Sequence, residues 1–224
     1  MDLLVINPPR VFPLRPGYQN AKRFIDLTLC VISLPVVLPV IALCILAIWL
    51  NSGRSIFFVQ ERIGRGGRPF RIYKFRTLML NHEANHGRSF MEAFIRGEAG
   101  DDQPTNGNFK PITDEQIFPV GRFLRRTSLD ELPQLINVIK GEMSIVGPRP
   151  NVPWEVAEYR PWHYERLEVL PGITGLAQVN GRSGIRFDTI VRYDINYIEN
   201  QNLALDLTII LKTISSVILS KGAG

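Results

Sequence analysis

Cysteine and histidine are scarce in this sequence, which has two cysteines and three histidines among its 224 residues. Cys30 and Cys44 both lie within one apolar run, which argues against a disulfide framework as the basis of the fold. His82 and His86 have the i, i+4 spacing of a metal-binding pair, but no third ligand lies nearby. We therefore interpret them as ordinary surface histidines.

No internal repeat, extended low-complexity tract or cleavable signal peptide is apparent, because the first apolar residues are few and lack a basic lead-in. At this length the chain can form one good core but not two large domains. The formal net charge is +5 and the pI is near 9.4. This balance favours anionic partners such as nucleic acid, acidic lipid or phosphorylated metabolites.

Charge is absent from residues 27–50, a run of 24 residues whose hydropathy predicts a membrane segment. A straight helix of that length measures ~36 Å, slightly more than the roughly 30 Å hydrocarbon core. Pro35 and Pro39 interrupt the helix, and basic residues flank both of its ends, so both ends favour the same side. We predict a re-entrant helix broken at Pro39, with a single straight span as the alternative. Lys22 and Asp26 are spaced to pair at its entry.

After the apolar run, residues 55–64 and 69–78 have the composition of two strands around the glycine turn "RGGR". Lys74 and Arg76 share one face of the second strand, which suits a phosphate ligand. A solvated basic face near lipid headgroups explains the same pair equally well. Residues 97–116 are polar and rich in turn formers, which predicts a loop.

The stretch "RRTSLDELPQL" places two carboxylates side by side, Asp130 and Glu131. One interpretation is structural, because Ser128 followed three residues later by Glu131 is the pattern of a helix capping box. The other is chemical: helix amides attract phosphate, Arg125 and Arg126 neutralise diphosphate oxygens, and a carboxylate attacks phosphorus to form an acyl phosphate. The second acid then holds a divalent cation or handles a proton.

Beyond the acid pair, the apolar spacing of residues 132–139 predicts a helix that ends at Gly141. A short buried strand follows in "MSIVG" and leads to the turn "PRP". The segment "PGITGLAQVNGR" reads as a glycine-rich loop, and residues 193–219 suit one amphipathic helix on the membrane or on the core.

Five blocks occur together and in order: "KRFID", "QERIGRGGRPFRIYKFRTL", "RFLRRTSLDELPQLINVIKGEMSIVGPRP", "PGITGLAQVNGR" and "YIENQNLALDLTIILKT". From Lys22 to the C-terminus the sequence resembles the bacterial sugar transferases called monotopic polyprenol-phosphate phosphoglycosyl transferases. Five ordered blocks are more specific than any single motif.

The resemblance implies transfer of a sugar 1-phosphate from a UDP-sugar to undecaprenyl phosphate with release of UMP. It implies that Asp130 is the nucleophile, that Glu131 is its partner and that Mg²⁺ is the cofactor, bound by both carboxylates. The candidate phosphate-binding residues are Lys74, Arg76, Arg125, Arg126, Arg149 and Arg182. The partners expected are the UDP-sugar, the lipid carrier and membrane lipids; nucleic acid is not expected, and a homodimer is left open.

The fold expected is α+β and mainly helical: a monotopic membrane protein with an N-terminal re-entrant helix-break-helix, a small β-hairpin and surface amphipathic helices. Residues 1–21 would form a lead-in, 22–52 the re-entrant membrane helix and 53–224 a cytosolic catalytic domain with the C-terminal helix. The resemblance implies the cytoplasmic face of the bacterial inner membrane and a pathway of exopolysaccharide, O-antigen or glycoprotein glycan assembly. The alternative function is a non-catalytic, membrane-anchored basic adaptor in which the acid pair only caps a helix.

Overall fold

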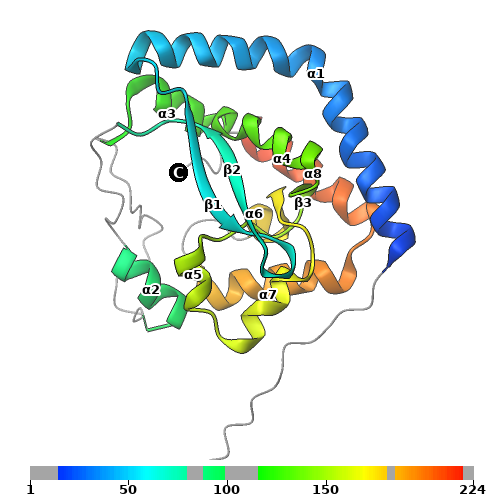
Figure 1. Ribbon diagram of the computed structural model, residues 1–224. Helices are drawn as coiled ribbons and strands as arrows, with labels where there is room; N and C mark the ends of the chain where they lie inside the picture. Colours follow the sequence, from blue (N-terminus) through cyan, green and yellow to red (C-terminus); the bar gives the residue numbers. More distant parts are fainter. Residues whose placement is uncertain (1–14, 80–87, 99–115, 181–184, 219–224) are drawn as a thin grey trace, which may run out of the picture.

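The computed structural model describes residues 15–79, 88–98, 116–180 and 185–218. These residues form a mainly helical body around two small sheets (Figure 1). The helices are α1 (Pro16–Ser52), α2 (Arg88–Arg96), α3 (Pro119–Arg126), α4 (Leu135–Lys140), α5 (Pro153–Ala157), α6 (Leu176–Asn180), α7 (Phe187–Asn200) and α8 (Leu203–Ile218). The 3-10 helices are η1 (Arg65–Gly67), η3 (Leu129–Gln134) and η4 (Pro161–Glu168), and the strands are β1 (Phe57–Ile63), β2 (Pro69–Phe75), β3 (Ser144–Val146) and β4 (Gly172–Thr174). Most of the loop predicted over 97–116 lies outside the described residues, as do His82 and His86.

The apolar run forms a single helix, α1, which is long and apolar enough to cross a membrane. It begins at Pro16, six residues before the predicted start, and a proline fits there because first-turn amides need no helical partner. The helix continues through Pro35 and Pro39, so the predicted break at Pro39 is not a break in the helical backbone. Figure 1 instead shows α1 bent near its middle into two arms, as expected where proline rings displace preceding carbonyls.

Both ends of α1 are bonded to the same folded body. Near the first end, the Asp26 carboxylate accepts a hydrogen bond of 2.7 Å from the Ser144 hydroxyl. At the other end, the Arg76 guanidinium donates to the carbonyls of Ser52 and Ser55, at 2.7 and 2.5 Å. The first arm packs Cys30 against Ile72, Val138 and Met143, and the second packs Cys44 and Ile48 against Phe75, Phe118 and Leu124. Each arm therefore contributes one side of a buried apolar cluster.

Lys22 pairs with a different acid from the one predicted. Its ammonium lies 3.1 Å from the Asp206 carboxylate of α8, while Asp26 is bonded to Ser144. Asp206 also accepts hydrogen bonds from the hydroxyls of Tyr18 (2.8 Å) and Tyr197 (2.7 Å). We call Tyr18, Lys22, Tyr197 and Asp206 the Asp206 cluster. It joins the first arm of α1 to α7 and α8.

The predicted hairpin is confirmed. Strands β1 and β2 pair antiparallel in a register that runs from Phe57–Phe75 to Ile63–Pro69. The connecting turn contains Gly66 and Gly67, both with positive φ, a conformation that glycine adopts without steric cost.

The second sheet was only half predicted. The expected strand in "MSIVG" is β3, but the segment interpreted as a glycine-rich loop contains β4, which pairs with β3 in parallel. A Cβ on Gly147, Gly172 or Gly175 would overlap neighbouring backbone, so these glycines permit the two strands to approach. The glycines that suggested a loop are required by strand packing.

The C-terminal region contains two helices, α7 and α8, where one was predicted. The side-chain oxygen of Asn202 accepts a hydrogen bond of 2.9 Å from the Leu205 amide and so caps the start of α8. Along α8, Leu203, Leu207, Leu211 and Ile214 stay exposed, while Ile209 is fully buried. This helix is therefore amphipathic, as the sequence predicted for the region.

Candidate active site

The acid pair does not form the capping box that its sequence allows. Asp130 and Glu131 lie in η3, and Ser128 at its N-cap makes no side-chain capping bond. The Ser128 amide donates to the Arg125 carbonyl at 3.1 Å, so Glu131 does not cap it. Ser128 itself has a positive φ of 55°, which is unusual for a residue other than glycine. The capping interpretation is wrong for these side chains.

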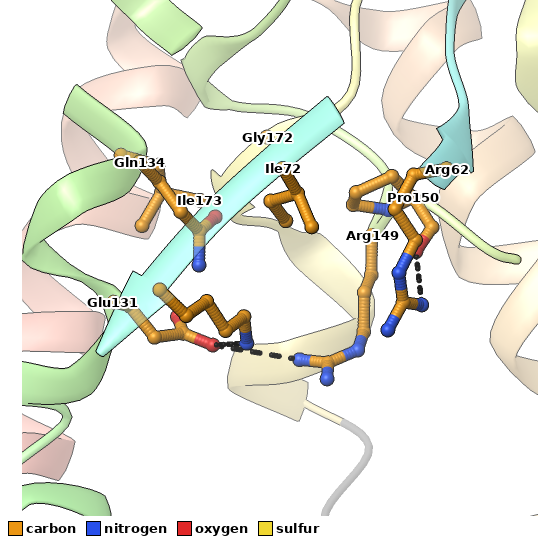
Figure 2. A pocket seen from close by; sticks show the side chains of 9 residues that line it. Arg62, Ile72, Glu131, Gln134, Arg149, Pro150, Gly172 and Ile173 are labelled. Atoms are coloured by element: carbon orange, nitrogen blue, oxygen red, sulfur yellow. Dashed lines mark hydrogen bonds and ion pairs between the residues drawn. The ribbon is translucent and has the colours of Figure 1, made fainter. Parts of the chain in front are cut away.

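Glu131 instead faces cations from two other parts of the chain. Its Oε1 accepts a 2.6 Å hydrogen bond from Lys74 Nζ of β2 and lies 3.9 Å from an Arg149 nitrogen after β3. Figure 2 shows the Glu131 and Arg149 side chains pointing toward one another. Burial opposes ionisation of Glu131, but Lys74 and Arg149 outweigh it, so the pKa of this carboxyl lies below its usual range.

Asp130 is in the opposite electrostatic situation. Burial and the neighbouring Glu131 raise the pKa of Asp130 to about 6, although Lys74 and Arg125 act to lower it. Within the described part of the chain, no side chain forms a hydrogen bond or ion pair with its carboxylate. A carboxylate that is costly to ionise and has no such partner is available to a ligand or an electrophile.

Arg125 supplies a further unsatisfied group. It lies at the end of α3, and one of its guanidinium nitrogens is buried with no hydrogen-bond partner among the described residues. Buried donors are normally paired, so this nitrogen has a donor to offer an anion beside Asp130.

Sequence reasoning missed two polar side chains of the pocket, Arg62 and Gln134. Both line it together with Lys74, Glu131 and Arg149 (Figure 2). Burial and the nearby Arg149 lower the pKa of Arg62 to about 10, and its buried Nε has no partner among the described residues. The sequence signal that could have identified Arg62 is its position in the first predicted strand of the hairpin, twelve residues before Lys74. No sequence signal indicated Gln134.

The structure brings together only some of the predicted phosphate-binding residues. Lys74, Arg125 and Arg149 surround the acid pair. Arg76 is buried and donates to the carbonyls that hold the end of α1, so it serves the fold. Arg126 is exposed and takes no part in the site contacts among the described residues, and Arg182 lies outside them.

We call Arg62, Lys74, Glu131 and Arg149 the Glu131 cluster; it places three cations around one carboxylate. Such an excess of positive charge in a partly buried site suits a phosphate or diphosphate group. Among the described residues, no group of three or more His, Cys, Asp or Glu side chains is placed to hold a metal ion. Asp130 and Glu131 nevertheless fit Mg²⁺, which commonly takes one or two carboxylates and completes its shell with phosphate oxygens and water.

Comparison with known proteins gives the class to which this site belongs. The family model described as "Bacterial sugar transferase" matches residues 17–220, so the chain belongs to the bacterial sugar transferase family. It is 37% identical to the exopolysaccharide production protein ExoY of Sinorhizobium fredii over 96% of this chain and 93% of that protein.

Two longer relatives carry more explicit names. The galactosyl transferase CpsE of Streptococcus agalactiae is 39% identical over 91% of this chain and 43% of its own length. The undecaprenyl-phosphate galactose phosphotransferase of Salmonella typhimurium is 35% identical over 92% of this chain and 43% of its own length. The chain thus spans less than half of each of these two proteins.

Proposed function

We propose that this chain transfers a sugar 1-phosphate from a UDP-sugar to undecaprenyl phosphate and releases UMP, at the first membrane step of exopolysaccharide, O-antigen or glycoprotein glycan assembly. The observation that carries the proposal is the environment of the acid pair. Glu131 is bonded to Lys74 instead of capping η3, and one nitrogen each of Arg62 and Arg125 is buried nearby with no partner in the described part of the chain. A helix cap requires none of these cations.

Asp130 acts as the nucleophile in this proposal. Its carboxylate oxygen attacks the phosphorus that carries the sugar, and the bond from that phosphorus to the oxygen of UMP breaks. An oxygen of undecaprenyl phosphate then attacks the same phosphorus, which releases the Asp130 carboxylate and leaves the sugar on a lipid diphosphate. The raised pKa of Asp130 favours this role, because a poorly stabilised carboxylate is the more reactive one.

The cations bind and orient the charged groups during both steps. Lys74 and Arg149 hold Glu131 ionised beside the nucleophile, and Arg62 and Arg125 provide donors for phosphate oxygens. Mg²⁺, held by Asp130 and Glu131, would neutralise diphosphate charge and so favour departure of UMP.

We further propose that α1 enters the membrane from the cytoplasmic face and returns to it. In support of this, Asp26 near one end of α1 and Ser52 at the other end are hydrogen-bonded to the same folded body. Between them, the two arms expose apolar side chains such as Val36 (71%) and Leu43 (66%). A straight span would place the two polar ends on opposite sides of the bilayer.

Topology is tested with single cysteines at Asn20 and Ser55, both exposed, in a variant with Cys30 and Cys44 replaced by alanine. Both positions should react with a membrane-impermeant maleimide in inverted vesicles and resist it in right-side-out vesicles. Labelling from opposite sides would establish a span.

The reaction is tested first without the lipid acceptor. Purified protein in nanodiscs with Mg²⁺ and a panel of UDP-sugars should release one UMP per active site and gain the mass of a sugar phosphate. Asp130→Asn should lose both signals, while the matched control Asp188→Asn, whose ion pairs to Arg160 and His163 lie outside the pocket, should keep them.

Turnover that requires undecaprenyl phosphate and shows no prior burst would replace the covalent intermediate with direct transfer. Normal turnover by Asp130→Asn would remove Asp130 from the nucleophile role. No UMP release with any donor, with or without the acceptor, would refute the proposed activity for the sugars in the panel.

A further inference from the structure

The turn that carries Arg149 is held at every carbonyl. From Pro148 to Asn151, the four carbonyl oxygens accept hydrogen bonds from the Gly172 amide (2.9 Å), Arg166 (3.1 Å), Arg62 (3.0 Å) and the Ile63 amide (2.9 Å) respectively. Four successive carbonyls with partners from three other elements fix the path of the backbone in this turn. The Arg149 side chain itself is 56% exposed, so its location depends on that backbone.

Arg166 makes the most extensive of these contacts. It comes from η4, is only 3% exposed, and also donates to Asn151 Oδ1 at 2.6 Å and to the Tyr159 hydroxyl at 2.8 Å. Its charge is matched by Asp194 of α7, which is 1% exposed and lies 2.6 Å away. A planar guanidinium can satisfy several acceptors in one fixed geometry, which the single ammonium of lysine cannot.

A buried ion pair needs an explanation other than stability. Desolvation of two charges offsets much of their attraction, and packed apolar residues often stabilise a fold as well. The burial of Asp194 opposes its ionisation so strongly that, even with Arg166 beside it, the pKa of Asp194 is raised to about 6. What an apolar pair would not provide is the set of donors that Arg166 directs at the turn.

We propose that Arg166, held by Asp194, is a positioning residue that fixes the turn at Pro148–Asn151 and thereby aims Arg149 at the donor diphosphate. The placement of the turn follows from the contacts above, while the diphosphate as target rests on the proposed function. Arg166 acts through Arg149 and does not touch the substrate itself.

The test is a double-mutant cycle on UMP-releasing turnover. Arg166→Lys keeps the charge beside Asp194 but loses the planar guanidinium that donates to several acceptors. We expect kcat to fall roughly tenfold, because small displacements of a positioned group slow the reaction. In an Arg149→Gln background, chosen to retain some turnover, the same change should cost less than about twofold, because there is no longer a guanidinium to aim. Arg160→Lys is the matched control: Arg160 binds Asp188 and the Arg96 carbonyl, away from the turn, and its variant should keep kcat.

Amide hydrogen exchange gives a readout that needs no substrate. The Ile63 and Gly172 amides donate to the turn, so both should exchange faster in Arg166→Lys and stay unchanged in Arg160→Lys. If Arg166→Lys fails to fold in a thermal melt, Asp194→Asn, which keeps the side-chain volume, takes its place in both measurements.

Equal losses in the two backgrounds, or an unchanged kcat, would overturn the proposal, because a purely structural role predicts additive effects. The two proposals also fail in different ways. Absence of UMP release by the wild type with every donor would refute the proposed function. In that case unchanged exchange at Ile63 and Gly172 would refute the positioning role, and faster exchange would support it.

Discussion

The Asp206 cluster and the Glu131 cluster contain similar side chains but differ in how completely their polar groups are paired. In the Asp206 cluster, one carboxylate meets one ammonium and two hydroxyls, and both of its oxygens accept hydrogen bonds. In the Glu131 cluster, one carboxylate is bonded to Lys74, lies 3.9 Å from Arg149 and shares its pocket with Arg62. A nitrogen of Arg62 is left without a partner among the described residues.

We interpret the Asp206 cluster as a structural contact between elements and the Glu131 cluster as a candidate binding site. A polar cluster with matched charge and satisfied groups holds two elements together and gains nothing from another ion. A cluster with surplus cations is costly until an anion arrives, and such a cost is typical of functional sites. The predictions that follow challenge this contrast, from the largest expected effect to the smallest.

Removing a cation from the Glu131 cluster should damage activity most. We expect Lys74→Met to lower kcat/KM for the donor about 100-fold, as for loss of a buried charge-assisted contact. Burial of Glu131 would then be less opposed, so the pKa of its carboxyl should rise and activity should be lost at a higher pH on acidification. The measurement is a pH profile of kcat/KM. Lys140→Met, at an exposed lysine bonded to Tyr73, is the control and should behave as wild type.

Removing the acid of the Asp206 cluster should instead damage stability. Asp206→Ala leaves Lys22 and two tyrosine hydroxyls without their acceptor, which should cost about 2–4 kcal/mol of unfolding free energy. Denaturant unfolding in detergent micelles measures the loss, and kcat per folded molecule should stay near wild type. A variant with wild-type stability but little turnover would show that this cluster is not merely a structural contact.

Asp130 should destabilise the fold in a pH-dependent way. Its pKa is raised to about 6 in the folded protein, against an ordinary value of 3.8, so folding favours the protonated acid. Its destabilising effect is absent below about pH 4, grows as pH rises toward 6 and is complete above it. Without divalent cations, Asp130→Asn should therefore gain about 1–3 kcal/mol at pH 7.5 and little at about pH 3.5. Glu131→Gln, at a carboxyl whose pKa is lowered, should lose stability at pH 7.5; the same sign for both variants would contradict this account.

The smallest effect is expected at Ser128. Because its φ is 55° and its side chain makes no capping bond, Ser128→Gly should relieve backbone strain and gain about 0.5 kcal/mol. The measurement is the free energy of unfolding. Ser215→Gly inside α8 is the control and should lose about 0.5 kcal/mol. A comparable loss at Ser128 would restore its side chain to a capping role.

Local patterns predicted much of the fold, and pairings remote in sequence explain most of what was missed. The hairpin, the Gly141 helix end and the apolar helix all follow from signals within a few residues. Lys22 had an acid at the right helical spacing, yet it pairs with Asp206, 184 residues away. Strand β4 was missed because its glycines resemble a loop until the backbone of β3 is known to lie against them.

For the candidate site too, local sequence signals identified some residues, and contacts remote in sequence decided the rest. Adjacent acids and nearby arginines identified Asp130, Glu131 and Arg125 as candidates, but the sequence could not choose between a cap and a reaction centre. That choice depends on where Lys74 lies, 57 residues before Glu131. Arg76 is the opposite case. Its charge suggested phosphate binding, but its guanidinium donates to backbone carbonyls at the end of α1.

The close approach of β3 and β4 also limits which substitutions this protein can accept. No side chain fits at Gly147, Gly172 or Gly175 without moving backbone. The strand pair lies at the base of the Arg149 turn, where Gly172 donates to the Pro148 carbonyl. A mutational library spread evenly over the chain should thus lose nearly all variants at these three positions, and altered donor preference should be selected from the segments around the pocket.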